Sequence, residues 1–101
     1  MKAVRVQYTV KPEYVEQNKA NVKGVMDDLR NNPIEGMRYS TFYLGEGSFM
    51  HLNVCKDQET MSLLGERDSF KHFRSGLKAS GPVSPPKAEP MNYVGSSYDI
   101  L

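Results

Sequence analysis

The sequence predicts a ferredoxin-like α+β domain, with a four-stranded antiparallel sheet and helices on one face. Segments with a period of two residues and segments with helical spacing alternate in the order β-α-β-β-α-β. A chain of 101 residues is long enough for one domain only, spanning 1–101. Because βαβ-type crossovers are right-handed, this order places both helical regions on the same side of the sheet.

The first strand is expected from Ala3 to Val10, where apolar and mostly β-branched side chains alternate with mainly polar ones. A helix is then expected from Glu13 to about Asn31, with Pro12 near its first position. An apolar stripe with a single polar interruption runs along one face of this helix: Tyr14, Asn18, Val22, Val25, Met26 and Leu29. Pro33 is expected to end the helix, because a proline disfavours the α conformation in the residue that precedes it.

The second and third strands are expected at Gly36–Leu44 and Phe49–Cys55, joined by a short glycine-rich link typical of a hairpin. The following helical region has an apolar stripe from Met61 to Leu77, and Gly65 and a capping Asp68 predict its division into two pieces.

The remaining chain is expected to form a linking loop and a closing strand. The proline-rich stretch 81–86 is incompatible with a regular helix or a central strand, so it is interpreted as a loop. The residues from Met91 to Ile100 are then expected to form the fourth strand.

Composition bears on the partners and the compartment. The chain has 13 Lys and Arg against 12 Asp and Glu, a balance that disfavours non-specific binding to nucleic acid or to an anionic membrane. One cysteine fits a reducing compartment, and no apolar run approaches the ~18 residues of a membrane span, so we expect a cytoplasmic protein. RNA-recognition domains share this element order, but Arg5, Gln7 and Thr9 stand where their first strand needs a stacking aromatic.

The helix-free face of the sheet is predicted to be the functional surface. Val4, Val6, Tyr8 and Val10 are expected to meet the helices, together with Met50, Leu52 and Val54. The free face would then carry Arg5, Gln7, Thr9, Phe49, His51 and Asn53. Four strands of this length cover roughly 500 Å² per face. A mixed patch of that size usually has a partner, so we predict a homodimer.

Several segments resemble the antibiotic-biosynthesis-monooxygenase-like proteins of the dimeric α+β barrel superfamily. The first strand, running into Lys11-Pro12-Glu13, is similar to their strand-then-Lys-Pro entrance. The stretches 57–60 and 69–73, and the proline pair followed by 93–97, also resemble this family. The resemblance implies a homodimer whose two sheets form a barrel, with a small-molecule pocket inside the barrel or between sheet and helices.

The resemblance also limits the reactions that are expected of this protein. Some relatives are monooxygenases that act on phenolic or quinol substrates without a cofactor, some degrade haem, and many have no assigned activity. The haem-degrading branch relies on a Trp and a helix His, whereas this chain has no Trp and its His72 lies off the apolar stripe. The resemblance therefore implies a cofactor-independent monooxygenase-like protein that acts on or binds a small aromatic or phenolic molecule in a pocket of the homodimeric barrel. The alternative is a non-catalytic homodimer that binds a small ligand or has a structural role.

His51 is the candidate catalytic residue, because imidazole titrates near neutral pH and oxidation of a phenol by O₂ needs a base. Arg5, Gln7 and Asn53 are candidate donors to the resulting anion, since the first and third strands are neighbours in this topology. The alternative is that His51 is a hydrogen-bonded wall or interface residue, and that Arg5 pairs with a carboxylate at the sheet edge.

Aromatic residues are the candidate stacking groups for a flat ligand. Phe49 would act with either Tyr39 and Tyr43 or, if the second strand faces the other way, Phe42. Packing within a dimer is the alternative role for all of them. No metal site is predicted, because His51, Cys55 and His72 lack the spacing and number of ligands that zinc needs, and Cys55 is interpreted as a small buried side chain.

Overall fold

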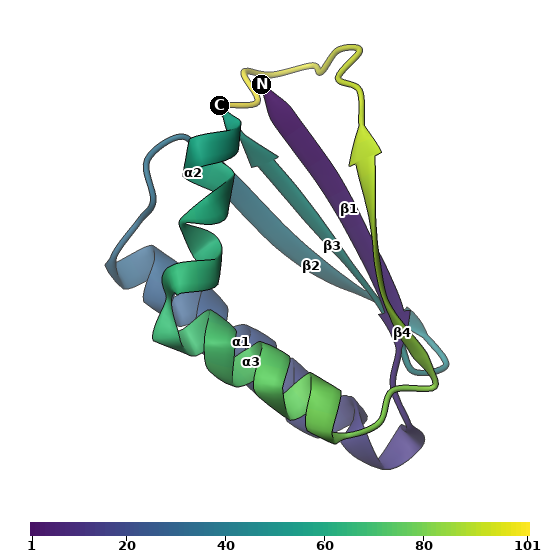
Figure 1. Cartoon of the computed structure of the whole chain (residues 1–101). Coiled ribbons are helices and arrows are strands. Elements are labelled where there is room, and N and C mark those ends of the chain that lie inside the picture. The colour runs from purple at the N-terminus through teal and green to yellow at the C-terminus, as the bar shows by residue number, and fades with distance from the viewer.

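The predicted ferredoxin-like arrangement is confirmed. The computed structural model describes residues 1–101 and contains one antiparallel sheet with the strand order β2-β3-β1-β4. Its strands are β1 (Lys2–Thr9), β2 (Met37–Gly45), β3 (Ser48–Cys55) and β4 (Ser84–Met91). The helices all lie on one side of this sheet, and the two termini lie together at one end of it (Figure 1).

The helical regions follow the expected plan. A 3-10 turn at Pro12–Tyr14 leads into α1 (Val15–Asn31). The second region is divided as predicted, into α2 (Gln58–Ser62), a 3-10 turn (Leu64–Glu66) and α3 (Asp68–Ala79). Asp68 is the first residue of α3, and the cap position belongs to Arg67 without a side-chain bond, so the expected Asp68 cap is wrong by one residue. No helix combines the length and apolar character of a bilayer-spanning segment.

The register of the sheet corrects the expected facing of the third strand. Tyr8 lies opposite Phe49, and Val6 lies opposite His51. Directly opposed residues of antiparallel strands share a face, so the odd-numbered residues of β3 lie on the helix side with Tyr8. The expected facing of β1 is therefore confirmed, and the expected facing of β3 is wrong. The residues of β3 buried under the helices are Phe49, His51 and Asn53, and those on the open face are Met50, Leu52 and Val54.

The core between sheet and helices is small and aromatic. Tyr8 and Phe49 stack with their ring centroids 5.6 Å apart, and Phe73 of α3 packs 6.4 Å from Tyr8. Seven buried side chains make up the central cluster: Tyr8, Val10, Val25, Phe49, Leu64, Phe73 and Leu77. These contacts fix the position of the β1–β3 pair relative to α1 and α3.

The fourth strand lies earlier in the chain than expected. β4 runs over Ser84–Met91, through the prolines assigned to a loop, while residues 92–101 form no regular strand. β4 is an edge strand paired only with β1, and an edge strand tolerates prolines because one side of its backbone needs no partner. Every residue of β4 except Met91 is exposed, so neither of its faces is covered by the helices.

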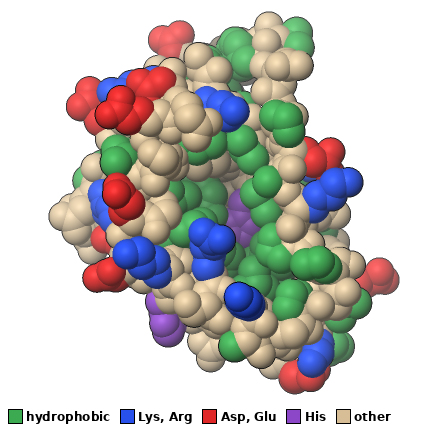
Figure 2. Space-filling view, viewed as in Figure 1, with side chains coloured by type: hydrophobic (Ala, Val, Ile, Leu, Met, Phe, Trp, Pro, Cys, Tyr) green, Lys and Arg blue, Asp and Glu red, His purple; other side chains and the backbone are tan.

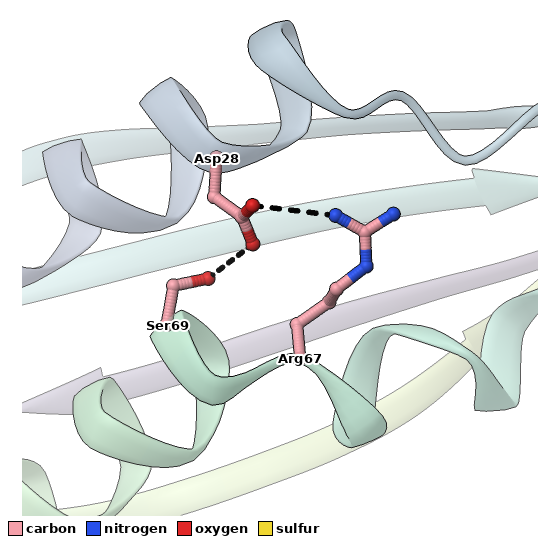
Figure 3. Close-up of polar contacts among 3 residues, drawn as sticks. All are labelled: Asp28, Arg67 and Ser69. Carbon is pink, nitrogen blue, oxygen red and sulfur yellow. Dashed lines mark hydrogen bonds and ion pairs between the residues drawn. The ribbon is translucent and has the colours of Figure 1, made fainter.

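A polar contact holds α1 and α3 together. The Asp28 carboxylate accepts a hydrogen bond from the Ser69 hydroxyl at 2.7 Å and pairs with the Arg67 guanidinium at 3.4 Å (Figure 3). The Ser69 hydrogen bond and then the Arg67 charge lower the pKa of Asp28. The carboxylate therefore stays ionised across the neutral range and fixes the start of α3 against α1.

Candidate functional site

His51 lies in the middle of β3 and is only 3% exposed. Its Nε2 lies 2.7 Å from the Tyr8 hydroxyl on the neighbouring strand β1. Its Nδ1 lies 2.5 Å from the Tyr39 hydroxyl and 3.0 Å from the Thr41 hydroxyl, both on β2. The imidazole therefore connects hydroxyl groups on the two strands that flank its own.

The chain of hydrogen bonds continues into α1. Asn18 donates from Nδ2 to the Tyr8 hydroxyl oxygen at 2.8 Å. Asn18 is fully buried, and its Oδ1 has no hydrogen-bond partner. The polar chain thus runs from α1 through β1 and β3 to β2, and it ends inside the protein at an amide.

The partners of Tyr8 determine the tautomer of His51. The Asn18 amide nitrogen can only donate, so the Tyr8 oxygen accepts from it. If His51 Nε2 also donated to that oxygen, the hydroxyl hydrogen of Tyr8 would be buried with no acceptor. Tyr8 therefore donates to Nε2, the proton of the imidazole is on Nδ1, and Nδ1 donates to the hydroxyl oxygens of Tyr39 and Thr41.

Burial keeps every group in this chain uncharged. Desolvation lowers the pKa of His51 to about 4, so the imidazole is neutral at pH 7. Burial also raises the pKa values of the Tyr8 and Tyr39 hydroxyls well above their ordinary range. An imidazole with so low a pKa is a weak base, and Asn18 at the inner end can neither take up nor release a proton. The arrangement is suited to orienting hydroxyl groups rather than to removing a proton from a substrate.

A groove of about 520 Å³ lies between α1 and the free edge of β2. Tyr39 and Thr41, the two partners of His51 Nδ1, are among its lining residues. Because Nδ1 already donates to these two hydroxyls, at least one of their own hydrogens is left for another acceptor. The other walls are mainly apolar: Val22, Met26, Leu29, Ile34, Met37 and Phe42.

The surface on the β4 side is also hollowed. Figure 2 shows a depression between the helices and β4 with a histidine at its floor, hydrophobic side chains around it, and Lys or Arg side chains along its lower rim. This depression exists because the helices leave β4 uncovered. The buried side of the sheet is thus approached by surface hollows from both of its edges.

The structure separates the predicted site residues into two groups. Arg5 and Gln7 lie on the open face, where Arg5 donates to the Gln7 side chain at 3.2 Å and pairs with Glu89 of β4 at 3.9 Å. The sheet itself lies between them and His51, so the expectation that they act as donors around His51 is wrong. The ion pair with Glu89 matches the alternative role considered for Arg5.

The other predicted residues share the helix side with His51. Tyr39 and Tyr43 face the same way as His51, whereas Phe42 faces the open side, which decides between the two aromatic alternatives. Tyr39 bonds to His51, but Tyr43 is 41% exposed and accepts a hydrogen bond from the Gly47 amide at 2.9 Å.

Phe49 and Asn53 are enclosed within the protein. Phe49 stacks in the core, and Asn53 is buried with its side-chain oxygen accepting from the Cys55 thiol at 3.2 Å. Neither residue is among those that line the groove. Their positions are those of packing residues on either side of His51.

Sequence reasoning missed three members of the chain around His51: Tyr8, Asn18 and Thr41. Asn18 could have been found, because it is the one polar residue in the apolar stripe of α1 and therefore had to meet a buried polar partner. No three His, Cys, Asp or Glu side chains lie close enough together to hold a metal ion.

Comparison with solved structures shows that the chain has the fold of antibiotic biosynthesis monooxygenases. A crystal structure of an antibiotic biosynthesis monooxygenase superposes with a TM-score of 0.79 at 17% identity, over 94% of this chain and 100% of that one. A Nitrosomonas europaea protein provisionally named as such a monooxygenase gives 0.77 at 15%, over 92% and 89%.

A conserved protein from Methanosarcina mazei Go1 gives a TM-score of 0.72 at 22% identity, over 90% of this chain and 92% of that one. No family model matches the sequence, and no curated protein matches it either. At these identities the similarity establishes the shared fold and leaves the ligand to be argued from the site.

Proposed function

We propose that this protein is a homodimer that binds a small phenolic molecule in the groove between α1 and β2. The aromatic body of the ligand lies against the apolar walls, and its hydroxyl oxygen accepts from Tyr39 or Thr41. The observation that carries this proposal is the end of the buried hydrogen-bond chain at the hydroxyls of Tyr39 and Thr41, two residues that both line the groove.

The size and lining of the groove support this function. Small-molecule sites usually enclose ~300–1,000 Å³, are mainly apolar, and present a few convergent polar groups. The groove has about 520 Å³, and seven of its eleven lining residues are hydrophobic. His51 acts here as a positioning residue, because its Nδ1 proton fixes which way the two hydroxyls donate.

Cofactor-independent oxygenation of the bound phenol is the second candidate function. The names of two proteins that share this fold favour it. Its requirement is a base that removes the phenol proton, and the weak basicity of His51 and the buried amide at the inner end of the chain argue against that role. Binding without turnover is therefore the function that the site supports best.

The binding proposal is tested with methyl 4-hydroxybenzoate and with methyl benzoate, which lacks only the hydroxyl. A ligand that binds the folded state raises its melting temperature, so at about ten times its Kd the phenol should raise it by several degrees. Thr41→Val removes one hydroxyl with little change in shape, and we expect it to reduce the preference for the phenol about three- to tenfold.

Tyr93→Phe is the control for this experiment, since its hydroxyl bonds only to Ser96 on the exposed C-terminal segment. Equal affinity for the two esters, or no binding of either, would contradict the proposal. Consumption of O₂ in the presence of the phenol would instead establish the oxygenase function.

The open face of the sheet supports the homodimer. Leu52 lies near its centre, and Phe42 on β2, which lies opposite Met50, is 49% exposed. Met50 and Val54 complete an apolar patch that no helix covers. A second copy of the same face would bury this patch together with Arg5, which lies directly opposite Leu52 and pairs with Glu89.

Light scattering at micromolar concentration should therefore give twice the chain mass of 11.4 kDa. Leu52→Lys should yield a monomer, because it would place a second positive charge beside Arg5, its directly opposed neighbour, in the centre of the interface. Ser75→Lys introduces the same charge on the exposed surface of α3 and should leave the dimer intact. A wild-type mass near that of one chain would exclude this homodimer.

A further inference from the structure

We infer that the groove between α1 and β2 selects aromatic carboxylates, with the carboxylate of the ligand paired to Arg30. This inference rests on the proposed function, because it assigns the charge of the molecule that the same groove would bind. It adds a second polar contact, at the opposite chemical end of the ligand from the phenolic hydroxyl.

Arg30 is the only charged residue among the eleven that line the groove. It lies in the last turn of α1 and is exposed. The guanidinium forms none of the ion pairs of the protein, all four of which use Arg5, Lys19, Lys23 or Arg67. Its five N–H donors are therefore available to a carboxylate, which a guanidinium can bind through two parallel hydrogen bonds.

The other lining residues favour the same class of ligand. No Asp or Glu lines the groove, so an anionic ligand meets no like charge within it. The apolar side chains of Met26 and Met37, which also line the groove, offer contacts to an aromatic ring. A molecule that combines a hydroxyl, a flat ring and a carboxylate matches this set of lining groups.

The inference is tested by titrating 4-hydroxybenzoate against its methyl ester, which keeps the phenol and removes the charge. We expect the wild-type protein to bind the acid roughly two- to fivefold more tightly at low salt, the range for an exposed Arg–carboxylate pair. Arg30→Gln should remove this preference and leave the affinity for the ester unchanged. Added salt should weaken the acid alone.

Lys23→Gln is the matched control, because it removes one positive charge from the same helix at a residue that pairs with Asp27 outside the groove. It should keep the preference for the acid. Equal binding of acid and ester, or a preference that survives Arg30→Gln, would overturn the inference while the phenol-binding function stands. Failure of both ligands to bind would overturn both.

Discussion

Acidification from pH 6.5 to pH 4 should reduce the free energy of unfolding by about 3 kcal/mol through His51 alone. Burial lowers the pKa of this imidazole from 6.5 to about 4, and each pKa unit corresponds to ~1.4 kcal/mol. Above pH 6.5 the group is neutral in both states, so its contribution is complete. Below that value the unfolded chain takes up a proton that the folded protein excludes, and stability is lost until the folded pKa is reached.

Chemical denaturation across this range measures the effect. His51→Gln should flatten the pH dependence, whereas the exposed His72→Gln should leave it as in the wild type. The pKa values of Asp28 and Asp57 are lowered, so their contributions are lost only at still lower pH. The ring signals of His51 give an independent test by NMR, since they should not titrate until about pH 4. A midpoint near 6.5 would contradict the buried, neutral imidazole.

The order of elements could be predicted from the sequence because each segment carries its own periodicity. The two errors in the sheet have physical reasons. In β3 the more hydrophobic set of alternating residues suggests the core-facing side: Met50, Leu52 and Val54. The buried set instead contains His51 and Asn53, whose polar groups are satisfied by hydrogen bonds. The prolines of β4 indicated a loop because their tolerance depends on the strand being at the edge, which only the assembled sheet decides.

The candidate site could be predicted only in part. His51 and Tyr39 could be identified as chemically interesting residues of adjacent strands, and they do bond to each other. Their relation to Tyr8 and Asn18 depends on the register between β1 and β3 and on the rotation of α1, neither of which a single sequence determines. Because β3 has the opposite facing to the expected one, His51 lies on the helix side of the sheet while Arg5 and Gln7 lie on the open face. A shift of one residue in a strand is enough to move every side chain to the other face.

Tyr8→Phe should destabilise the protein by about 2–4 kcal/mol although it removes only one oxygen atom. The Tyr8 hydroxyl accepts from Asn18 at 2.8 Å and donates to His51 at 2.7 Å, and all three side chains are buried. Its loss leaves His51 Nε2 without a donor and deprives the Asn18 amide of its only partner. Each unsatisfied buried polar group costs ~1–3 kcal/mol. Tyr93→Phe, on the exposed C-terminal segment, should change stability by less than ~0.5 kcal/mol.

A double-mutant cycle with Asn18→Leu separates this explanation from a simple packing defect. Leucine has a similar size and no polar atoms, so it removes the orphaned Oδ1 together with the Nδ2 that Tyr8 satisfies. When both partners of a buried hydrogen bond are replaced, the cost falls well below the sum of the single changes. We therefore expect Tyr8→Phe/Asn18→Leu to be more stable than additivity predicts by ~1 kcal/mol or more. Strict additivity would mean that Asn18 and Tyr8 are not coupled, and the hydrogen-bond chain would then end at Tyr8 rather than in α1.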